Sequence, residues 1–233
     1  MFGSVPNTAL FAMERIKLGP RLEAVASFIP KGAAVADVGT DHGLLPIWLR
    51  TTDPSSSVIA SDLRTGPLAA ARKNADKHHV EGIRFRLCSG LQDIKPEEAD
   101  TVVIAGMSGE TICAILREAS WDWQGKRLIL EANTKHPELL TWLYRHGLTV
   151  SGEKIPEEHG RFYRVYCVVS GKAPVPRKAY LWGGFTDSPY ARRQAEILQH
   201  ALSGLIRSAD PDDALRRAEF EDVLEDMKDA YHW

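Results

Sequence analysis

The stretch Val35-Ala-Asp-Val-Gly-Thr-Asp-His-Gly-Leu-Leu-Pro46 is the most informative part of the sequence for the fold class. It lies on a short apolar run with β-branched residues, 33–38, which predicts a strand, and the strand must stop at Gly39, where a turn begins. At the carboxyl end of the first strand of an α/β sheet, a glycine lets the backbone turn tightly and lets a ligand approach the main chain. The stretch therefore predicts a ligand-binding loop, with a purely structural strand-turn-helix connection as the alternative.

Outward from this loop, strand and helix patterns alternate along the chain. Further strands are predicted at 58–61, 83–87, 101–105 and 127–130. Helices are predicted at 21–29, 68–77, 112–118 and 138–146. Such alternation is typical of a doubly wound, mostly parallel α/β sheet with helices on both faces. Two extended runs, 149–155 and 162–169, follow with no helix between them, so the sheet should end in an antiparallel hairpin.

The composition shifts after this hairpin. Proline, glycine and aromatic residues dominate 171–187, which predicts a linker or irregular arm. Beyond it, one apolar stripe runs from Tyr190 through Ile197 to Leu205, and a second helical pattern includes Leu215 and Met227. We therefore predict a sheet domain over 1–170, with an N-terminal helix, a linker over 171–187, and an antiparallel helical hairpin over 188–233.

The length, net charge and cysteine content of the chain limit the classes of function that it can have. The 233 residues suffice for one α/β domain and a small appendage. The net charge of −2 gives the whole chain no electrostatic footprint for nucleic acid, so any RNA-binding surface would be local. The three cysteines are far apart and in no Cys-x-x-Cys spacing, so we expect neither disulfides nor a metal site. We expect no membrane association and a cytoplasmic protein, because no apolar run approaches the roughly 20 residues that span a bilayer and the start of the chain lacks a leader pattern.

Two carboxylates, Asp37 and Asp41, flank the glycine of the first loop. The dinucleotide pattern G-x-G-x-x-G is absent, since Asp41 stands where the second glycine would be and would repel a pyrophosphate. S-adenosylmethionine has no phosphate and has a cationic sulfonium, so an acidic loop suits it. Asp37 and Asp41 would accept hydrogen bonds at the amino-acid end of this cofactor, and His42 is a further candidate. Asp62, which ends the second strand, is spaced to hold ribose hydroxyls, and Ser89 is placed to contact adenine.

Small residues follow the fourth strand. Gly106 leaves room for a methyl donor and a flat acceptor, and Met107 would pack on either. The Asn/Asp-Pro-Pro-aromatic run often found in enzymes that methylate an exocyclic amino group is absent, which favours a ring nitrogen with its in-plane lone pair. Positioning would then be the main catalytic device. Asn133 is a candidate to read a base edge, and Tyr163 to stack on a flipped base, although both residue types also serve in packing and capping.

Several separate motifs, in order, resemble one known family, the bacterial tRNA adenine-N1 methyltransferases of the TrmK type, which modify adenine 22. The motifs are Arg21-Leu22 with Ile29-Pro-Lys-Gly-Ala33, Asp37-Val-Gly-Thr-Asp-His42, Gly66-Pro67, Ile104-Ala-Gly-Met107 and Leu128-Ile-Leu130 with Asn133. The resemblance implies a Rossmann-like class I methyltransferase sheet, a C-terminal helical hairpin thought to help hold tRNA, S-adenosyl-L-methionine as cofactor and tRNA as partner. Carried over position by position, it implies the cofactor-binding residues Arg21, Asp37, Gly39, Thr40, Asp41, His42, Asp62, Leu63, Ser89, Gly90, Leu91, Ala105, Gly106 and Met107. It implies Asp41, Asn133 and Tyr163 as catalytic residues.

Departures from the family pattern concern the substrate more than the fold. Asp62 stands where the family commonly has Glu, and Ser89 replaces a carboxylate expected near the adenine. Ser108 replaces a glycine, and Glu131-Ala-Asn133 replaces Gln-Pro-Asn. The sequence therefore leaves three alternatives to methylation of tRNA: another RNA, a small molecule, or a non-catalytic binding module on the same fold. It leaves the choice between monomer and homodimer open.

Overall fold

The computed structural model describes residues 16–206, 208 and 210–233. The opening segment, in which we saw no leader pattern, lies mostly outside these residues. No helix in the described part is long and apolar enough to cross a membrane. The three cysteines, all within it, are free and buried.

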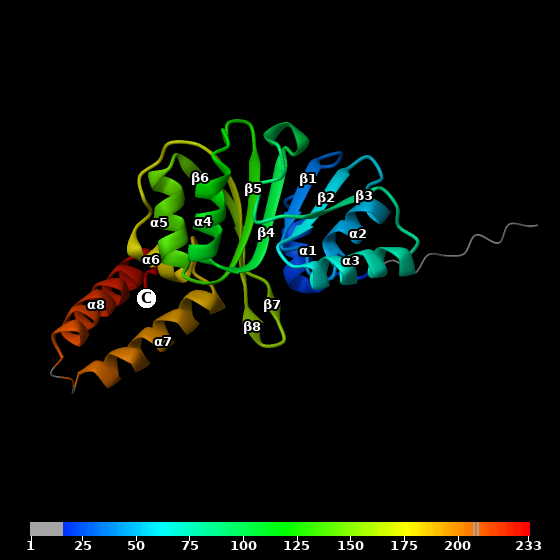
Figure 1. Ribbon diagram of the computed structural model, residues 1–233. Coiled ribbons are helices and arrows are strands. Elements are labelled where there is room, and N and C mark those ends of the chain that lie inside the picture. The colour runs from blue at the N-terminus through cyan, green and yellow to red at the C-terminus, as the bar shows by residue number, and fades with distance from the viewer. Residues whose placement is uncertain (1–15, 207, 209) are drawn as a thin grey trace, which may run out of the picture.

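A seven-stranded sheet forms the centre, in the order β3-β2-β1-β4-β5-β9-β6 (Figure 1). Its strands are β1 (Ala34–Val38), β2 (Ser57–Asp62), β3 (Ile83–Leu87), β4 (Thr101–Ser108), β5 (Arg127–Thr134), β6 (Leu148–Lys154) and β9 (Arg164–Ser170). The strands β1 to β5 pair in parallel, whereas β9 is antiparallel to both of its neighbours, β5 and β6. The prediction of a doubly wound sheet that ends in an antiparallel pair is therefore confirmed. The turn that joins β6 to β9 adds a small hairpin of its own, β7 (Glu157–Glu158) with β8 (Arg161–Phe162).

Helices cover both faces of the sheet. The sheet-domain helices are α1 (Pro20–Ala26), α2 (Leu44–Thr52), α3 (Thr65–Lys77), α4 (Gly109–Ala119) and α5 (His136–Arg145), with a 3-10 turn at Pro96–Glu98. Alternate residues of the strands β1, β2, β4, β5 and β9 enter two cores. Ala36 packs with α4 and α5, whereas Val35 packs with α1 and α2. Burial on both faces explains why the central strands are almost continuously apolar.

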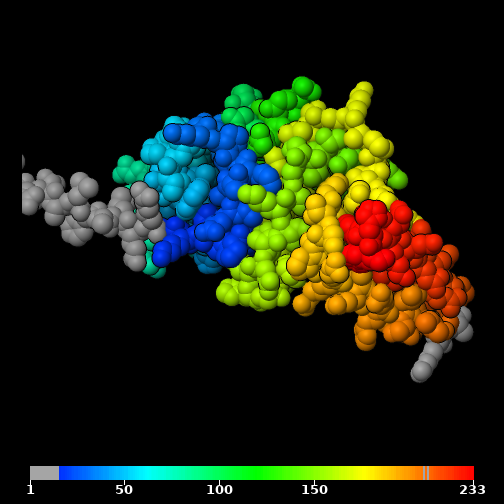
Figure 2. Space-filling view, turned by 180° about the vertical axis from the view of Figure 1, so that it is seen from behind, coloured from blue at the N-terminus to red at the C-terminus, as the bar shows by residue number. Residues whose placement is uncertain are grey.

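Three helices form the C-terminal part, α6 (Lys178–Gly183), α7 (Pro189–Leu205) and α8 (Pro211–Tyr231). A third apolar cluster holds them together, and the pair α7 and α8 projects from the β6 end of the sheet, away from β3 (Figures 1 and 2). Helix α6 lies in the segment that we expected to be irregular. Two residues of the expected apolar stripes are also exposed, Ile197 by 51% and Leu215 by 72%, so the stripes are narrower than the sequence indicated.

Candidate functional site

A cavity of about 510 Å³ opens at the carboxyl ends of the parallel strands, where the loops after β1, β2, β3 and β4 converge. The central strand β1 has β2 on one side and β4 on the other, so the chain reverses its direction of winding here. Ligands of open α/β sheets bind at such a switch point. Arg21, from α1, reaches the same cavity from outside the sheet.

The loop after β1 is shaped by Gly39. Its φ of +79° lies in the left-handed region, and a Cβ there would stand 2.5 Å from Met107 Cε. The amides of Gly39 and Thr40 both donate to the carbonyl oxygen of Ser61 on β2, at 2.8 and 2.9 Å. The backbone therefore forms a tight, open cradle that a side chain at position 39 would fill.

Asp37 is a buried carboxyl in the wall of this cavity, with 6% of the residue exposed. Burial raises the pKa of Asp37 to about 6, the nearby Asp62 carboxylate adds to the effect, and the Arg21 guanidinium opposes it. Thr40 Oγ1 is buried beside it and has no hydrogen-bond partner among the described residues. A ligand with a cationic hydrogen-bond donor would stabilise the ionised carboxylate and reverse its desolvation penalty.

Asp62 lies at the end of β2, also in the cavity wall and only 7% exposed. Its Oδ1 accepts the Arg64 backbone N–H at 2.8 Å, which holds the side chain in place. The remaining carboxylate capacity can accept hydroxyl donors. Beyond it the lining becomes more apolar, with Leu63, Cys88 and Ile115 around Ser89 and Gly90, and such walls suit a flat ring. The residues of the cavity thus fit S-adenosylmethionine. The Asp37 carboxylate would accept hydrogen bonds from its ammonium group, the Asp62 carboxylate would accept them from its ribose hydroxyls, and the apolar side chains would enclose its adenine.

The opposite end of the cavity is built on Gly106, whose φ is +80°. The pairing of β4 with β5 shifts register between Ala105 and Met107, so the chain bulges here. Two side chains of β5 hold the bulge. Glu131 Oε2 accepts the Gly106 N–H at 2.9 Å, and Asn133 Nδ2 donates to the Gly106 carbonyl oxygen at 2.8 Å.

Comparisons with known proteins agree with this geometry. A family model described as "Methyltransferase domain" matches residues 18–166. The tRNA (adenine(22)-N(1))-methyltransferase of Bacillus subtilis is 37% identical over 161 residues, which are 68% of this chain and 68% of the relative. The crystal structure of the B. subtilis m1A22 tRNA methyltransferase TrmK superposes with a TM-score of 0.81 at 29% identity, covering 92% of this chain and 99% of the other. The chain belongs to the TrmK family. A Streptococcus pneumoniae structure in complex with S-adenosyl-L-methionine is also similar, with a TM-score of 0.78 at 32% identity, over 93% of this chain and 100% of the other.

The resemblance to TrmK that the motifs indicated is therefore confirmed. The structure brings most of the expected cofactor residues to the cavity: Arg21, Asp37, Gly39, Thr40, Asp41, His42, Asp62, Leu63, Ser89, Gly90, Ala105, Gly106 and Met107. Leu91 is the exception, because only 2% of it is exposed and it packs in the core beneath α4.

The three expected catalytic residues lie in different surroundings. Asp41 lines the cavity and is exposed, and its Oδ2 is 3.7 Å from Nε2 of His42. Asn133 and Tyr163 do not line it. One amide hydrogen of Asn133 is donated to the Gly106 carbonyl oxygen, which leaves its second amide hydrogen and its oxygen to read a base. Two guanidinium groups lie over the ring of Tyr163. The Cζ atom of Arg21 is 5.6 Å from the ring centroid, and the Cζ atom of Arg161 is 5.8 Å from it.

Sequence reasoning did not predict several lining residues of this TrmK cavity. They are Leu22, Val38, Leu44, Leu45, Arg64, Cys88, Thr111 and Ile115. It also gave no role to Glu131, which was noted only as a departure from the family pattern. The available signal was a carboxylate directly after an apolar strand that is buried on both faces, because such a group requires a cationic or hydrogen-bonding partner.

Asp37 makes the stability of the cofactor-free TrmK protein depend on pH. Its folded pKa of about 6 exceeds the unfolded value of 3.8, so the folded state binds more protons between these values and stability falls as pH rises through this window. Asp37→Asn should remove the penalty and stabilise the cofactor-free protein by about 2 to 3 kcal/mol above pH 6, an advantage lost towards pH 4. Urea unfolding of both proteins between pH 4 and 8 measures this. A constant difference across the range would show that Asp37 has an ordinary pKa.

Proposed function

We propose that this protein transfers a methyl group from S-adenosylmethionine to N1 of an adenine in tRNA, with adenine 22 as the target implied by its TrmK relatives. The observation that carries the proposal is the pair of buried carboxylates, Asp37 and Asp62, in one switch-point cavity of a chain of this family. The non-catalytic alternative is less favourable, because a protein that only binds other macromolecules has no need of an Asp37 carboxyl that is desolvated inside a small-molecule cavity.

The chemistry requires little from a general base. When bound, S-adenosylmethionine supplies an electrophilic methyl group on a sulfonium. The lone pair of adenine N1 would form the new bond to this methyl carbon, the electron pair of the carbon–sulfur bond would stay on sulfur, and the positive charge would pass to the base. Asp41, exposed at the mouth of the cavity, stabilises this charge electrostatically. Gly106 and Met107 leave space for the ring, and Tyr163 flanks its approach beside Arg21.

The charges of the two C-terminal helices favour RNA over a small molecule. Helix α7 begins beside the β7–β8 hairpin, where the rings of Tyr190 and Phe162 are 6.1 Å apart. Its ionised side chains are two arginines and one glutamate, whereas α8 has eight acidic and three basic residues. The helix nearer the sheet's carboxyl edge is therefore the basic one, which suits a phosphate backbone. An enzyme that acts on tRNA in this way would work in the cytoplasm.

The decisive experiment supplies unmodified tRNA transcripts and labelled S-adenosylmethionine, followed by nucleoside analysis. We expect 1-methyladenosine, and we expect a transcript with guanine in place of adenine 22 to accept no label. Label in the second transcript would move the target to another adenine. Binding of the cofactor without transfer to any tRNA would favour a different acceptor, and failure to bind it would refute the methyltransferase proposal.

A further inference from the structure

We propose that Glu131 is a positioning residue, which fixes the bulge at Gly106 and the Arg21 side chain relative to each other and so sets the geometry of methyl transfer. The proposal rests on the proposed function. Glu131 itself does not line the cavity. It acts through two groups that do, one on β4 and one on α1.

A single oxygen of Glu131 makes both contacts. Oε2 accepts the Gly106 N–H at 2.9 Å and an Arg21 Nη1 hydrogen at 3.0 Å. The Glu131 side chain is fully buried, whereas 27% of the Arg21 side chain is exposed. This oxygen therefore joins two walls of the cavity that are 85 residues apart in the sequence.

Glu131 and Asn133 bind the two peptide groups that flank Gly106. Glu131 binds the Gly106 N–H and Asn133 the Gly106 carbonyl oxygen, so two side chains of one strand hold the same bulge from both ends. The next residue, Met107, reaches across the cavity to the cradle at Gly39. Release of Gly106 would therefore displace Met107, which lines the space between methyl donor and acceptor. A misplacement of about 1 Å can reduce a catalytic rate about a hundredfold.

Because the other oxygen of Glu131 has no partner among the described residues, substitutions of Glu131 can distinguish the effect of its hydrogen bonds from the effect of its charge. This oxygen, Oε1, is buried. In Glu131→Gln the amide oxygen can keep both contacts while the amide nitrogen takes the place of Oε1, so no existing hydrogen bond is lost. In Glu131→Met both contacts are lost at nearly the same side-chain volume. Burial raises the pKa of Glu131, against the influence of Arg21, so the charge itself is held at a cost.

The test compares single-turnover methyl transfer at saturating tRNA and cofactor with calorimetric binding of S-adenosylhomocysteine. We expect Glu131→Met to lower the rate of transfer ten- to a hundredfold, with the dissociation constant raised less than fivefold, because Asp37 and Asp62 are unchanged. Glu131→Gln should restore at least a third of the wild-type rate. Glu158→Gln is the matched control, since Glu158 approaches Arg21 at 3.9 Å but does not contact Gly106, and it should change the rate less than threefold.

Two further readouts complete the test. The Gly106 amide should exchange slowly with deuterium in the wild type and in Glu131→Gln, and rapidly in Glu131→Met, whether or not the tRNA is accepted. Asn133→Ala combined with Glu131→Met should be no slower than the slower single variant, because both side chains hold the same residue, Gly106, in the bulge. Wild-type transfer tests the proposed function. An unchanged rate in Glu131→Met, an equal loss in Glu131→Gln, or unaltered exchange at Gly106 would overturn the role of Glu131.

Discussion

Replacing Asp62 with alanine is expected to weaken the binding of S-adenosylmethionine by about 10- to 100-fold while the fold persists. A hydrogen bond to a charged group contributes about 1.5 to 3 kcal/mol, which corresponds to this range. Asp62 is only 7% exposed and is held at its Oδ1 by the Arg64 amide, so the carboxylate is already oriented before a ligand arrives. Ribose hydroxyls would therefore bind to a carboxylate that is already oriented, and the Asp62 side chain would lose little conformational entropy on binding.

Isothermal titration of the variant and the wild type measures this effect. Asp76→Ala is the matched control, because Asp76 is an exposed aspartate on α3 outside the cavity and should leave the affinity unchanged. Urea unfolding should show a loss of stability of about 1 kcal/mol or less for Asp62→Ala, since the hydrogen bond lost inside the protein is to the backbone amide of the exposed Arg64. Equal affinities of variant and wild type would remove Asp62 from the ribose role.

The sheet could be predicted from the sequence because its determinants are local. The strands β1, β2 and β4 contain apolar runs of a few residues that end at Gly39, Asp62 and Gly106, and helical periodicity fills the intervals. The position of the cavity then follows from topology, since parallel strands bring their following loops to one edge. Asp37 and Asp62 were found in this way, although they are 25 residues apart.

Other features depend on contacts that sequence spacing does not reveal. Leu91 is adjacent to Ser89 and Gly90, which line the cavity, yet Gly90 has a φ of +54° and the chain turns there, so the Leu91 side chain enters the core. Glu131 looked like a substitution beside the acceptor, whereas its function as a structural bridge depends on Arg21, 110 residues away. Helix α6 has only six residues, too few for a periodic pattern, and a side chain of β9 binds its last turn.

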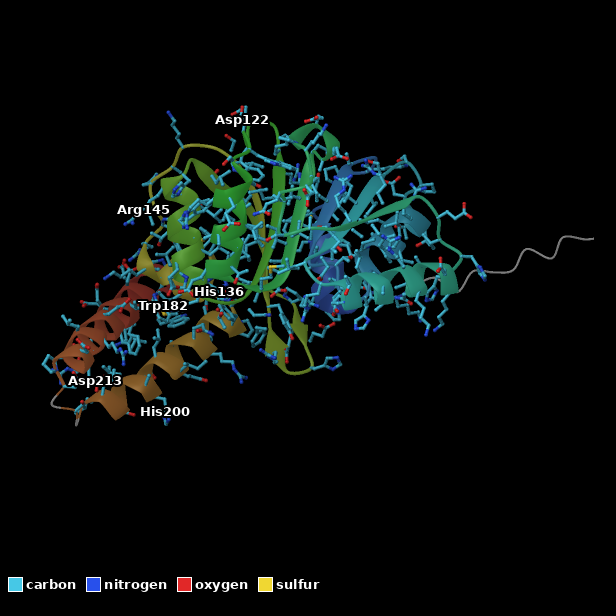
Figure 3. All side chains as sticks on the ribbon, viewed as in Figure 1. Asp122, His136, Arg145, Trp182, His200 and Asp213 are labelled. Atoms are coloured by element: carbon cyan, nitrogen blue, oxygen red, sulfur yellow. The ribbon has the colours of Figure 1, made fainter. Side chains whose placement is uncertain are left out.

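That side chain is Arg164, which is fully buried between the sheet and the C-terminal helices. Its Nη1 and Nη2 donate to the carbonyl oxygens of Leu181 and Tyr180 at 2.7 and 2.9 Å, in the last turn of α6, where the Tyr180 oxygen also accepts the Gly184 amide. Its Nε donates to Glu153 Oε1 at 2.8 Å, and Glu153 Oε2 accepts the Phe185 amide at 2.9 Å. Figure 3 shows His136 and Trp182 near this junction, at the start of the helical hairpin.

Burial and the Arg164 cation lower the pKa of His136 to about 3, so its ring is neutral at pH 7. Tyr166 hydroxyl and His136 Nδ1 are hydrogen-bonded at 2.9 Å. Among the described residues, the junction therefore joins the buried ion pair of Arg164 and Glu153 to the neutral hydrogen-bonded pair of Tyr166 and His136. A network of this kind fixes one arrangement of its members, because each alternative arrangement leaves a buried polar group unpaired.

Arg164→Met is accordingly expected to destabilise the protein by about 3 to 5 kcal/mol, because Glu153 would remain as a buried carboxylate without its cation. The double variant Arg164→Met with Glu153→Gln should recover part of this loss, since the uncompensated charge is gone while the Phe185 amide can keep its acceptor. Urea unfolding of the wild type, both single variants and the double variant measures the coupling. Equal stability of Arg164→Met and the double variant would show that the charge of Glu153 is not the cause.

The same variants distinguish binding of the cofactor from recognition of tRNA, the two parts of the proposed function. No described residue of β6, β9, α6, α7 or α8 lines the cofactor cavity, so the double variant should bind S-adenosylhomocysteine within about twofold of the wild type. Methyl transfer to tRNA should fall much further if α7 contributes to binding RNA, because α6 sets the position of α7 and Arg164 holds the end of α6. Transfer at the wild-type rate, in a folded protein with this junction broken, would mean that the substrate is recognised by the sheet domain and the β7–β8 hairpin alone.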